Sequence, residues 1–252
     1  MFMRLVQVKV KEGHLERLRD HYQQRIISAL EGLPGCRYAG LMKSVHHSEE
    51  CISLTLWDSE EDAEAYERSG MFEILLHETR PYLLESSESR LQLSQDLTLE
   101  YVPVPEEPVV SKLPVAARSD TLVPQREHRG AMWVRIVSLK LRTGKLEEFE
   151  RLYREQVIPA LRKVKGCRYI YLAERSDRVN EVLSVTSWET KEDAENYEKS
   201  GLYAALLESQ GGTLSELYNW KVKEQRSAGG LAATSEDPTL EQFDVVAGKA
   251  FK

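Results

Sequence analysis

The chain has 252 residues, of which 41% are hydrophobic and 30% charged, and its formal net charge is -7. No basic stripe interleaved with aromatic residues and no apolar run near the roughly 20 residues of a spanning helix is present, so we expect neither a nucleic-acid nor a membrane partner. Three cysteines, and a Met1 that leads directly into a strand pattern, predict a reduced, cytoplasmic protein without a signal peptide.

The first hundred residues alternate between the patterns of strands and helices. Residues 2–10 are rich in Val and Leu and predict a buried strand that Arg4 interrupts. Apolar residues then recur at helical spacing from Leu15 to Leu33, and Pro34-Gly35 ends that helix. Residues 36–42 and 51–57 predict two strands of a hairpin.

A second helix follows Trp57. Ser59-Glu-Glu-Asp62 has the residues of a capping box, in which the Ser hydroxyl accepts from the backbone N–H three residues on. Leu97–Val104 predicts a last strand. The order is therefore strand, helix, strand, strand, helix, strand, which is the ferredoxin-like plan of an antiparallel sheet with helices on one face.

The same pattern returns 131 residues later. Residues 1–77 align with 132–208 without a gap, with 30 identities in 77 positions. Such a period indicates a tandem duplication. The predicted closing strand of the second copy is Leu240–Val246, and its extra residues fall in 227–235. We expect repeat 1 at 1–104, a Pro-rich connector at 105–130 and repeat 2 at 131–252.

Two local features qualify this division. The connector holds prolines that predict a stiff, extended chain, yet Val109–Val115 has the composition to pair along a sheet edge. In the first helix of repeat 2, Pro159 stands where repeat 1 has Ser28. An interior proline removes a helical hydrogen bond, so we expect a break near Ile158.

Both faces of the predicted strands are apolar. In residues 51–57, Ile52, Leu54 and Leu56 alternate with side chains that would face the helices. The second face would be covered by the sheet of the other copy, because a large apolar patch is rarely left exposed on a monomer. We therefore expect an α+β fold in which the two sheets form one pseudo-dimeric β-barrel with helices outside. Further homodimerisation through other surfaces stays open.

These residues resemble a known family. The Trp-x-Ser/Thr start of the helix after the hairpin, the later Tyr and Ser-Gly, and the turns at Gly13 and Pro34-Gly35 are similar to antibiotic biosynthesis monooxygenase (ABM) domains of the dimeric α+β barrel superfamily. The resemblance covers about 1–104 and 132–247. It implies a small-molecule ligand and, in many members, oxidation of aromatic compounds without a cofactor.

The resemblance also implies candidate site residues. In cofactor-independent members, the Trp that matches Trp57 and Trp188 lines the substrate pocket, and an Asn four residues earlier helps to bind the substrate. That earlier position is Ser53 and Ser184 in this chain. The alternative role of the two Trp residues is packing of the helix start.

A haem-degrading activity is the second function that the resemblance offers. Such members carry an Asn on the first strand, a Trp on the following helix region and a haem-ligating His. The first two positions align with Val6/Val137 and Tyr66/Tyr197 in this chain, and only His77 lies near the third. We therefore expect no cofactor and treat haem as the alternative.

Tyr66 and Tyr197 are the polar residues that we assign to catalysis together with the two Trp residues, because a phenol between helix and sheet could orient a substrate. Packing in the core is their alternative role. Arg37 and Arg168 would bind an anionic group or form ion pairs. The pair His46-His47 has no second ligand cluster, so no metal site is expected.

The leading hypothesis is a cofactor-independent monooxygenase of a small aromatic or quinone-like compound. The alternatives are a haem protein and a non-catalytic ligand-binding pair.

Overall fold

The computed structural model describes residues 1–93, 99–105, 107–119, 132–220 and 237–251. The contacts divide the chain into two compact units. One contains Met1–Met3 and Ser111–Val245, and the other contains Arg4–Val110 and Val246–Lys252. No helix in the described part of the chain is both long enough and apolar enough to cross a membrane.

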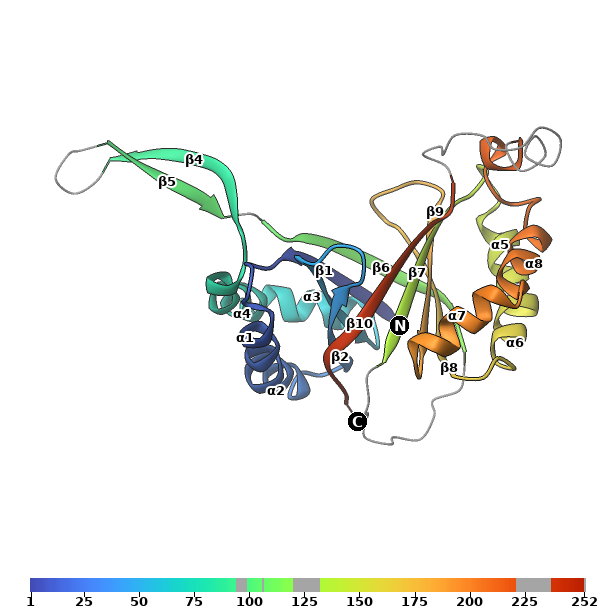
Figure 1. The fold of residues 1–252 in the computed structure, drawn as a ribbon, viewed down its shortest axis with the longest axis horizontal. Coiled ribbons are helices and arrows are strands. Elements are labelled where there is room, and N and C mark those ends of the chain that lie inside the picture. The colour runs from blue at the N-terminus through green and yellow to red at the C-terminus, as the bar shows by residue number, and fades with distance from the viewer. Residues whose placement is uncertain (94–98, 106, 120–131, 221–236, 252) are drawn as a thin grey trace. The chain divides into compact units, whose positions relative to one another are not determined.

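Eight strands form one closed barrel with the order β1-β3-β2-β10-β7-β9-β8-β6. Each repeat supplies a first strand and a hairpin, and β6 and β10 complete the order (Figure 1). The predicted α+β barrel of two ferredoxin-like halves is confirmed. The bounds are β1 Phe2–Lys9, β2 Cys36–Ser44, β3 Glu50–Trp57, β6 Val109–Arg118, β7 Trp133–Lys140, β8 Cys167–Glu174, β9 Glu181–Trp188 and β10 Thr239–Ala250.

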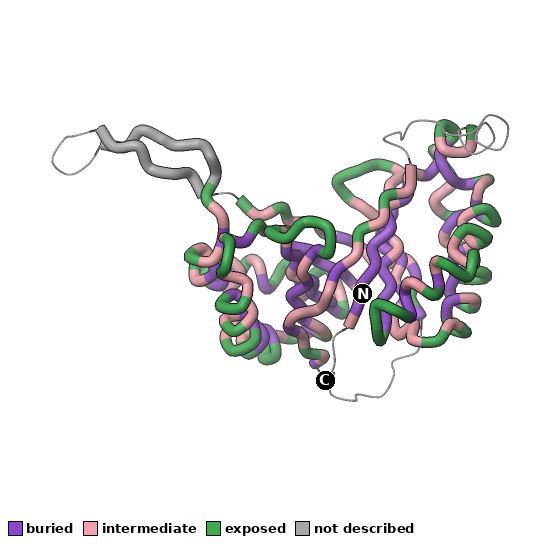
Figure 2. Tube along the Cα trace, in the orientation of Figure 1, coloured by how far each residue is buried: buried purple, intermediate pink, exposed green. Residues whose placement is uncertain are grey.

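The helices cover one face of the sheet of their own repeat, and their outer sides are exposed (Figures 1 and 2). Each first helix contains a π-helical segment, η1 or η3, between two α-helical pieces. The bounds are α1 Leu15–His21, η1 Tyr22–Ile26, α2 Ile27–Glu31, α3 Glu60–Arg68, α4 Met71–Thr79, η2 Arg80–Tyr82, α5 Leu146–Leu152, η3 Tyr153–Val157, α6 Ile158–Leu161, α7 Lys191–Lys199 and α8 Leu202–Ser209.

Helices α3 and α7 begin with the predicted caps. The hydroxyl of Ser59 accepts from the backbone N–H of Asp62 at 3.1 Å, and Thr190 accepts from Asp193 at 3.1 Å. Each hydroxyl also donates to the Asp carboxylate. This satisfies an N–H that has no partner within the helix, and it fixes where α3 and α7 start above the sheet.

The expected break near Ile158 is a π-helical turn. Segment η3 ends at Val157, and Pro159 lies in the first turn of α6. The wider turn accommodates the missing N–H of proline. Because η1 is present in repeat 1, where Ser28 replaces the proline and donates to the carbonyl of Gln24, the proline is not what produces the π turn.

The closing strand of repeat 1 differs from the prediction. The run that we expected to complete its sheet is mostly β5 (Leu99–Pro105), which pairs with β4 (Glu85–Leu93) in a separate two-stranded sheet. The barrel strand is instead β6, inside the predicted connector, and it pairs with β8. The prediction that Val109–Val115 pairs with a sheet is thus confirmed, with Val115 opposite Ala173, although β6 lies within the closed barrel and not at an edge. The closing role expected for Leu97–Val104 is wrong. Residues 120–131 and 227–235 lie outside the described residues.

The C-terminal end of β10 anchors the unit that contains repeat 1. Phe251 is 7% exposed, and its N–H donates to the carbonyl of Arg37 at 2.8 Å. We expect Phe251→Ala to lower the free energy of unfolding by about 3 kcal/mol, since it leaves a cavity. Val179→Ala is the control, because Val179 is 79% exposed and should change stability by less than about 0.5 kcal/mol. Equal effects of both variants in urea denaturation would show that this end of the chain is not anchored.

Candidate functional site

A pocket opens between the helices and the sheet of repeat 2. Its volume is about 40 Å³, which is room for roughly three water molecules. Strands β7 and β9 form its floor, and the helices form its walls. The lining residues are Arg135, Val137, Leu139, Tyr153, Val157, Leu161, Ser184, Thr186, Tyr197, Tyr203, Leu206, Leu207 and Gln210. The walls are thus mostly apolar, with a few converging polar groups, which is the usual make-up of a small-molecule site.

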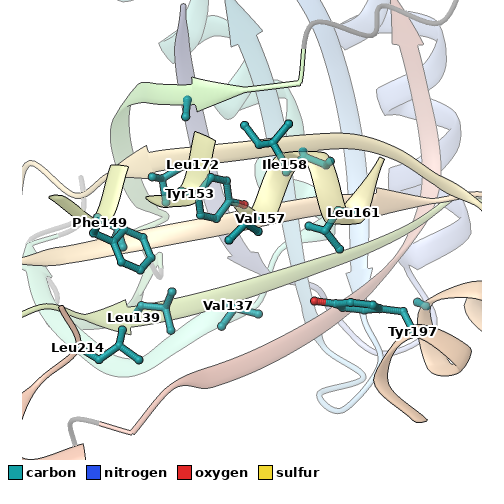
Figure 3. Packing of buried hydrophobic residues seen from close by; sticks show 14 of the residues in the cluster. Val137, Leu139, Phe149, Tyr153, Val157, Ile158, Leu161, Leu172, Tyr197 and Leu214 are labelled. Carbon is teal, nitrogen blue, oxygen red and sulfur yellow. The ribbon is translucent and has the colours of Figure 1, made fainter. Parts of the chain in front are cut away.

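Two tyrosines reach the pocket from different helices. Tyr153 is the first residue of η3, and Tyr197 lies on α7 (Figure 3). Val137, on strand β7, lies beside them and is the register partner of Ser184 on β9. The π turn matters here because it changes the direction in which the helix presents its side chains, and such turns are frequent at functional sites.

Tyr153 is held by the serine that the sequence singled out. Its hydroxyl lies 2.7 Å from Oγ of Ser184, and the matched pair in repeat 1, Tyr22 and Ser53, lies at 2.8 Å. Burial raises the pKa of the Tyr153 phenol, and the hydrogen bond with Ser184 only partly opposes this. At neutral pH the phenol of Tyr153 is therefore uncharged. It can donate and accept hydrogen bonds, but it cannot act as a general base.

Arg135 brings a positive charge to the pocket. It lies on β7 and is 2% exposed. Its Nε is 2.8 Å from Oε1 of Glu198, but the angle is that of an ion pair without a hydrogen bond, since Nε and Nη2 both lack hydrogen-bond partners among the described residues. The rings of Tyr197 and Tyr203 flank the guanidinium at 5.1 and 5.2 Å, a separation at which the negative ring faces attract a cation.

Trp57 and Trp188 stack on the tyrosines of the following helix. Trp188 is fully buried, stacks on Tyr197 with ring centroids 5.1 Å apart, and donates from Nε1 to Thr186 at 3.0 Å. Thr186 and Tyr197 line the pocket, whereas Trp188 does not. In repeat 1, Trp57 stacks on Tyr66 at 5.3 Å in the same way. The tryptophans thus position the lining residues.

The phenols of these stacks stay protonated. Burial raises the pKa of Tyr66 to about 12. Burial also raises the pKa of Tyr197, although the charge of Arg135 partly opposes this. Tyr197 can therefore donate a hydrogen bond to a ligand at neutral pH, and it does not compete with the ligand for the positive charge of Arg135.

The two repeats differ where the last helix covers the site. In α4, Leu75, Leu76 and Thr79 are buried, whereas α8 has no buried residue and its Leu206 and Leu207 are half-exposed. Four lining positions also change between the repeats. They are Val8/Leu139, Ile26/Val157, Phe72/Tyr203 and Thr79/Gln210. Helix α8 therefore packs less closely on its sheet than α4 does.

The remaining predicted site residues lie elsewhere. Arg37 is exposed and paired with Asp58 through two hydrogen bonds of 2.8 and 2.5 Å, and Arg168 pairs with Glu189. These are the ion pairs that the sequence offered as the alternative to anion binding. His77 is exposed on α4. None of the three residues lines the pocket.

Of the lining residues, the sequence predicts only Ser184 and Tyr197 as site residues. In the sequence, Arg135 only interrupts a strand pattern, and Tyr153 belongs to an apolar helix face. Tyr203 was not singled out because repeat 1 has Phe72 at that position. The signal that could have found Arg135 is a charge kept in both repeats, as Arg4 and Arg135, within an otherwise buried strand.

The lining residues do not fit a haem group. No His, Cys, Asp or Glu is among them, so they offer no imidazole or thiolate for the iron. A tyrosine binds haem iron as a phenolate, and burial raises the pKa of Tyr153 and Tyr197 and so keeps both phenols protonated. His77 is exposed, and the cavity is far smaller than a porphyrin. Among the described residues, no group of three or more His, Cys, Asp or Glu side chains is placed to hold a metal ion.

The Tyr153–Ser184 contact can be measured. Tyr153→Phe and Ser184→Ala are each expected to lower the free energy of unfolding by about 1 kcal/mol, and the double variant by less than the sum, because both remove the same hydrogen bond. Tyr22→Phe and Ser53→Ala form the matched cycle in repeat 1. Strictly additive losses would mean that the two hydroxyl groups do not interact in solution.

The described residues define an α+β barrel protein with a small, mostly apolar pocket in repeat 2. The family model described as antibiotic biosynthesis monooxygenase matches residues 1–74 and 132–209. This is more than half of the chain, which therefore belongs to the antibiotic biosynthesis monooxygenase family.

Solved structures share the fold at low identity. A putative monooxygenase from Fusobacterium nucleatum has a TM-score of 0.67 at 6% identity, with 99% of this chain and 94% of that chain covered. A second one, from Lactobacillus acidophilus, has a TM-score of 0.62 at 9% identity, with 100% and 99% covered. An anthrone oxidase-like protein has a TM-score of 0.53 at 13% identity, with 99% and 92% covered. A comparison with curated protein sequences gave no significant match.

Proposed function

We propose that this protein is a cytoplasmic monooxygenase that uses dioxygen, without a bound cofactor, to convert a small phenol or similar enolisable aromatic compound into a quinone. The observation that carries this proposal is the pocket of repeat 2, where Tyr153, Ser184 and Tyr197 meet inside apolar walls. Membership of the family and the fold shared with an anthrone oxidase-like protein support the same reaction class. Its three cysteines are unpaired, as in a reducing compartment.

The proposed reaction needs an ionised substrate and a dry site. A phenol loses its proton to water, and the phenolate transfers one electron to dioxygen. The resulting superoxide and phenoxyl radical combine at a ring carbon that carries hydrogen, and loss of water leaves the second carbonyl of the quinone. One oxygen atom enters the product and the other leaves as water. Apolar walls formed by Val137, Leu161 and Leu206 would exclude the bulk water that competes with these steps.

Size sets a further condition on the substrate. The cavity of about 40 Å³ is below the roughly 150 Å³ that a benzene ring occupies in an engineered apolar cavity. A ring therefore requires α8 to move outward. A single or double ring requires less movement than three fused rings, so we place a phenol or naphthol ahead of an anthrone.

The test is oxygen uptake by the full chain, purified and assayed with phenol, naphthol and anthrone in the presence of a metal chelator. We expect turnover of at least one of them, with one atom of isotopically labelled dioxygen in the quinone and the other in water. Release of hydrogen peroxide without label in the product would indicate an oxidase. Turnover that depends on added flavin or metal would contradict the cofactor-free reaction.

A further inference from the structure

Arg135 lines the pocket, and its guanidinium has an unused donor. Nη2 is fully buried and has no hydrogen-bond partner among the described residues. A buried donor of a charged group that lacks such a partner is costly, by more than the roughly 1–3 kcal/mol typical of a neutral polar group. The donor therefore favours whatever acceptor enters the pocket, and an anionic acceptor most of all.

The surroundings of Arg135 select for negative charge. The lining contains no carboxylate, and its other polar groups include the hydroxyls of Tyr153, Ser184 and Thr186. Glu198 faces Nε, not the pocket lining, and it also accepts from Gln242 at 3.2 Å. The charge of Glu198 is thus shared between Arg135 and Gln242. Because the lining itself holds no carboxylate, Arg135 is the charged group that a ligand in the pocket meets.

Repeat 1 provides the contrast. Arg4 is equally buried, pairs with Glu67 at 2.9 Å, and its Nη2 also lacks a hydrogen-bond partner among the described residues. There, however, the ring of Phe72 lies only 4.0 Å from the guanidinium carbon and covers it. In repeat 2 the matching ring, Tyr203, lies at 5.2 Å. An Arg whose Nη2 lacks a hydrogen-bond partner among the described residues thus occurs in both repeats. The one in repeat 2 lines the pocket described above.

We infer that the pocket of repeat 2 is a receptor for the anionic oxygen of a small planar ligand, a phenolate or an aromatic carboxylate, with Nη2 of Arg135 as the donor. The ring lies against the apolar walls, and the hydroxyl of Tyr197 is placed to donate a second hydrogen bond. This inference names the ligand class of the proposed enzyme and so rests on the same site. It does not require that the ligand be oxidised.

Helix α8 provides the space that a ring needs. None of its residues is buried, so an outward shift costs less apolar contact than a shift of α4, in which three residues are buried. Elements with few buried contacts are those that move most readily. The ligand is therefore expected to enter under Tyr203 and Leu206.

The test compares benzoate with benzamide, which has nearly the same shape but no charge. Calorimetric titration of the full chain is expected to give saturable binding of benzoate that is about ten to a hundred times tighter than that of benzamide. Arg135→Gln should remove this preference, whereas Arg4→Gln should keep it. Addition of 4-nitrophenol at a pH about two units below its own pKa, where the free compound is almost wholly protonated, should increase the phenolate absorbance with the wild-type chain and with Arg4→Gln, but not with Arg135→Gln.

Two further variants separate binding from folding. Arg135→Lys keeps the charge beside Glu198 but loses the second donor, and is expected to bind benzoate with intermediate affinity. Tyr203→Phe reproduces the ring that repeat 1 already carries, and should fold normally. The unfolding transition of each variant shows whether it is folded. In a folded variant, loss of the preference for benzoate over benzamide is then an effect on the binding site.

The outcomes distinguish the two proposals. Benzoate selectivity that depends on Arg135, without any oxidation of the phenols, would support the anion receptor and contradict the proposed monooxygenase activity. Oxidation of a phenol without a preference for benzoate over benzamide would support the monooxygenase activity and contradict the anion receptor. Equal binding of benzoate and benzamide, no saturable benzoate binding, or equal losses in Arg4→Gln and Arg135→Gln would each overturn the anion receptor.

Discussion

Replacing Arg135 with glutamine is expected to lower kcat/KM for a phenolic substrate by about a hundredfold to a thousandfold, the range for loss of a donor to a developing oxyanion. Arg135 lines the pocket, and its Nη2 has no hydrogen-bond partner among the described residues. Arg4→Gln in repeat 1 removes the same residue type at the matching position, where Phe72 covers the charge. It should change kcat/KM by less than about threefold, since its effect on the pocket is indirect.

The pH profile gives a second readout of this variant. A nearby positive charge lowers the pKa of a bound phenol, because it favours the ionised form. Removing the charge of Arg135 therefore raises that pKa, and the rise of kcat with pH should move upward by about one to two units. A variant with reduced activity but an unshifted profile would show that Arg135 acts through the fold, and not on the ionisation of the substrate.

Gly166→Ala is expected to cause a loss of stability as large as that of Phe251→Ala. Gly166 has φ +79° and would place its new methyl group in overlap with the carboxyl of Asp193. Asp193 cannot move aside, because it forms the cap of α7 with Thr190. A left-handed Ala costs about 1 kcal/mol and the overlap about 2 kcal/mol more, so we expect a loss of about 3 kcal/mol.

Gly144→Ala is the matched control for this prediction. Gly144 has φ +75°, nearly the same backbone conformation, but no atom lies within 4 Å of its added methyl group. Its loss should be about 1 kcal/mol, from the backbone alone. Thermal or urea unfolding measures both. Equal losses would mean that Asp193 relaxes and that the close approach of the turn to α7 is unimportant.

Features that recur in both repeats were predictable from the sequence. The caps at Ser59 and Thr190, and the stacking partners Trp57 and Trp188, occupy matching positions, and their chemistry is local. Local hydrogen bonds and periodic apolar faces follow from the spacing of residues. The second apolar face of the strands also predicted the barrel.

Features that depend on long-range pairing were not predictable in the same way. Leu97–Val104 and Val109–Val115 both have strand composition, and the pairing partner alone decides which one enters the barrel. The π turn at Tyr153 has no sequence signal that we recognised, so the direction of this side chain could not be derived. The sequence likewise does not show that α8 packs more loosely than α4.

The central claim is that ligands bind in the pocket of repeat 2. An exchange of lining residues tests it most directly. One variant gives repeat 2 three of the four differing residues of repeat 1 (Val157→Ile, Tyr203→Phe and Gln210→Thr), and the reciprocal variant makes the opposite changes (Ile26→Val, Phe72→Tyr and Thr79→Gln). Both keep the apolar character of the walls, so both are expected to fold.

The measurement is calorimetric titration of these two variants with benzoate. We expect the variant of repeat 2 to bind benzoate about tenfold more weakly or worse, because each lost polar contact and each added methyl group opposes the ligand. We expect the reciprocal variant of repeat 1 to bind benzoate with the affinity of the wild-type chain. Weakened binding in the repeat 1 variant, or unchanged binding in the repeat 2 variant, would contradict the assignment of the site to repeat 2.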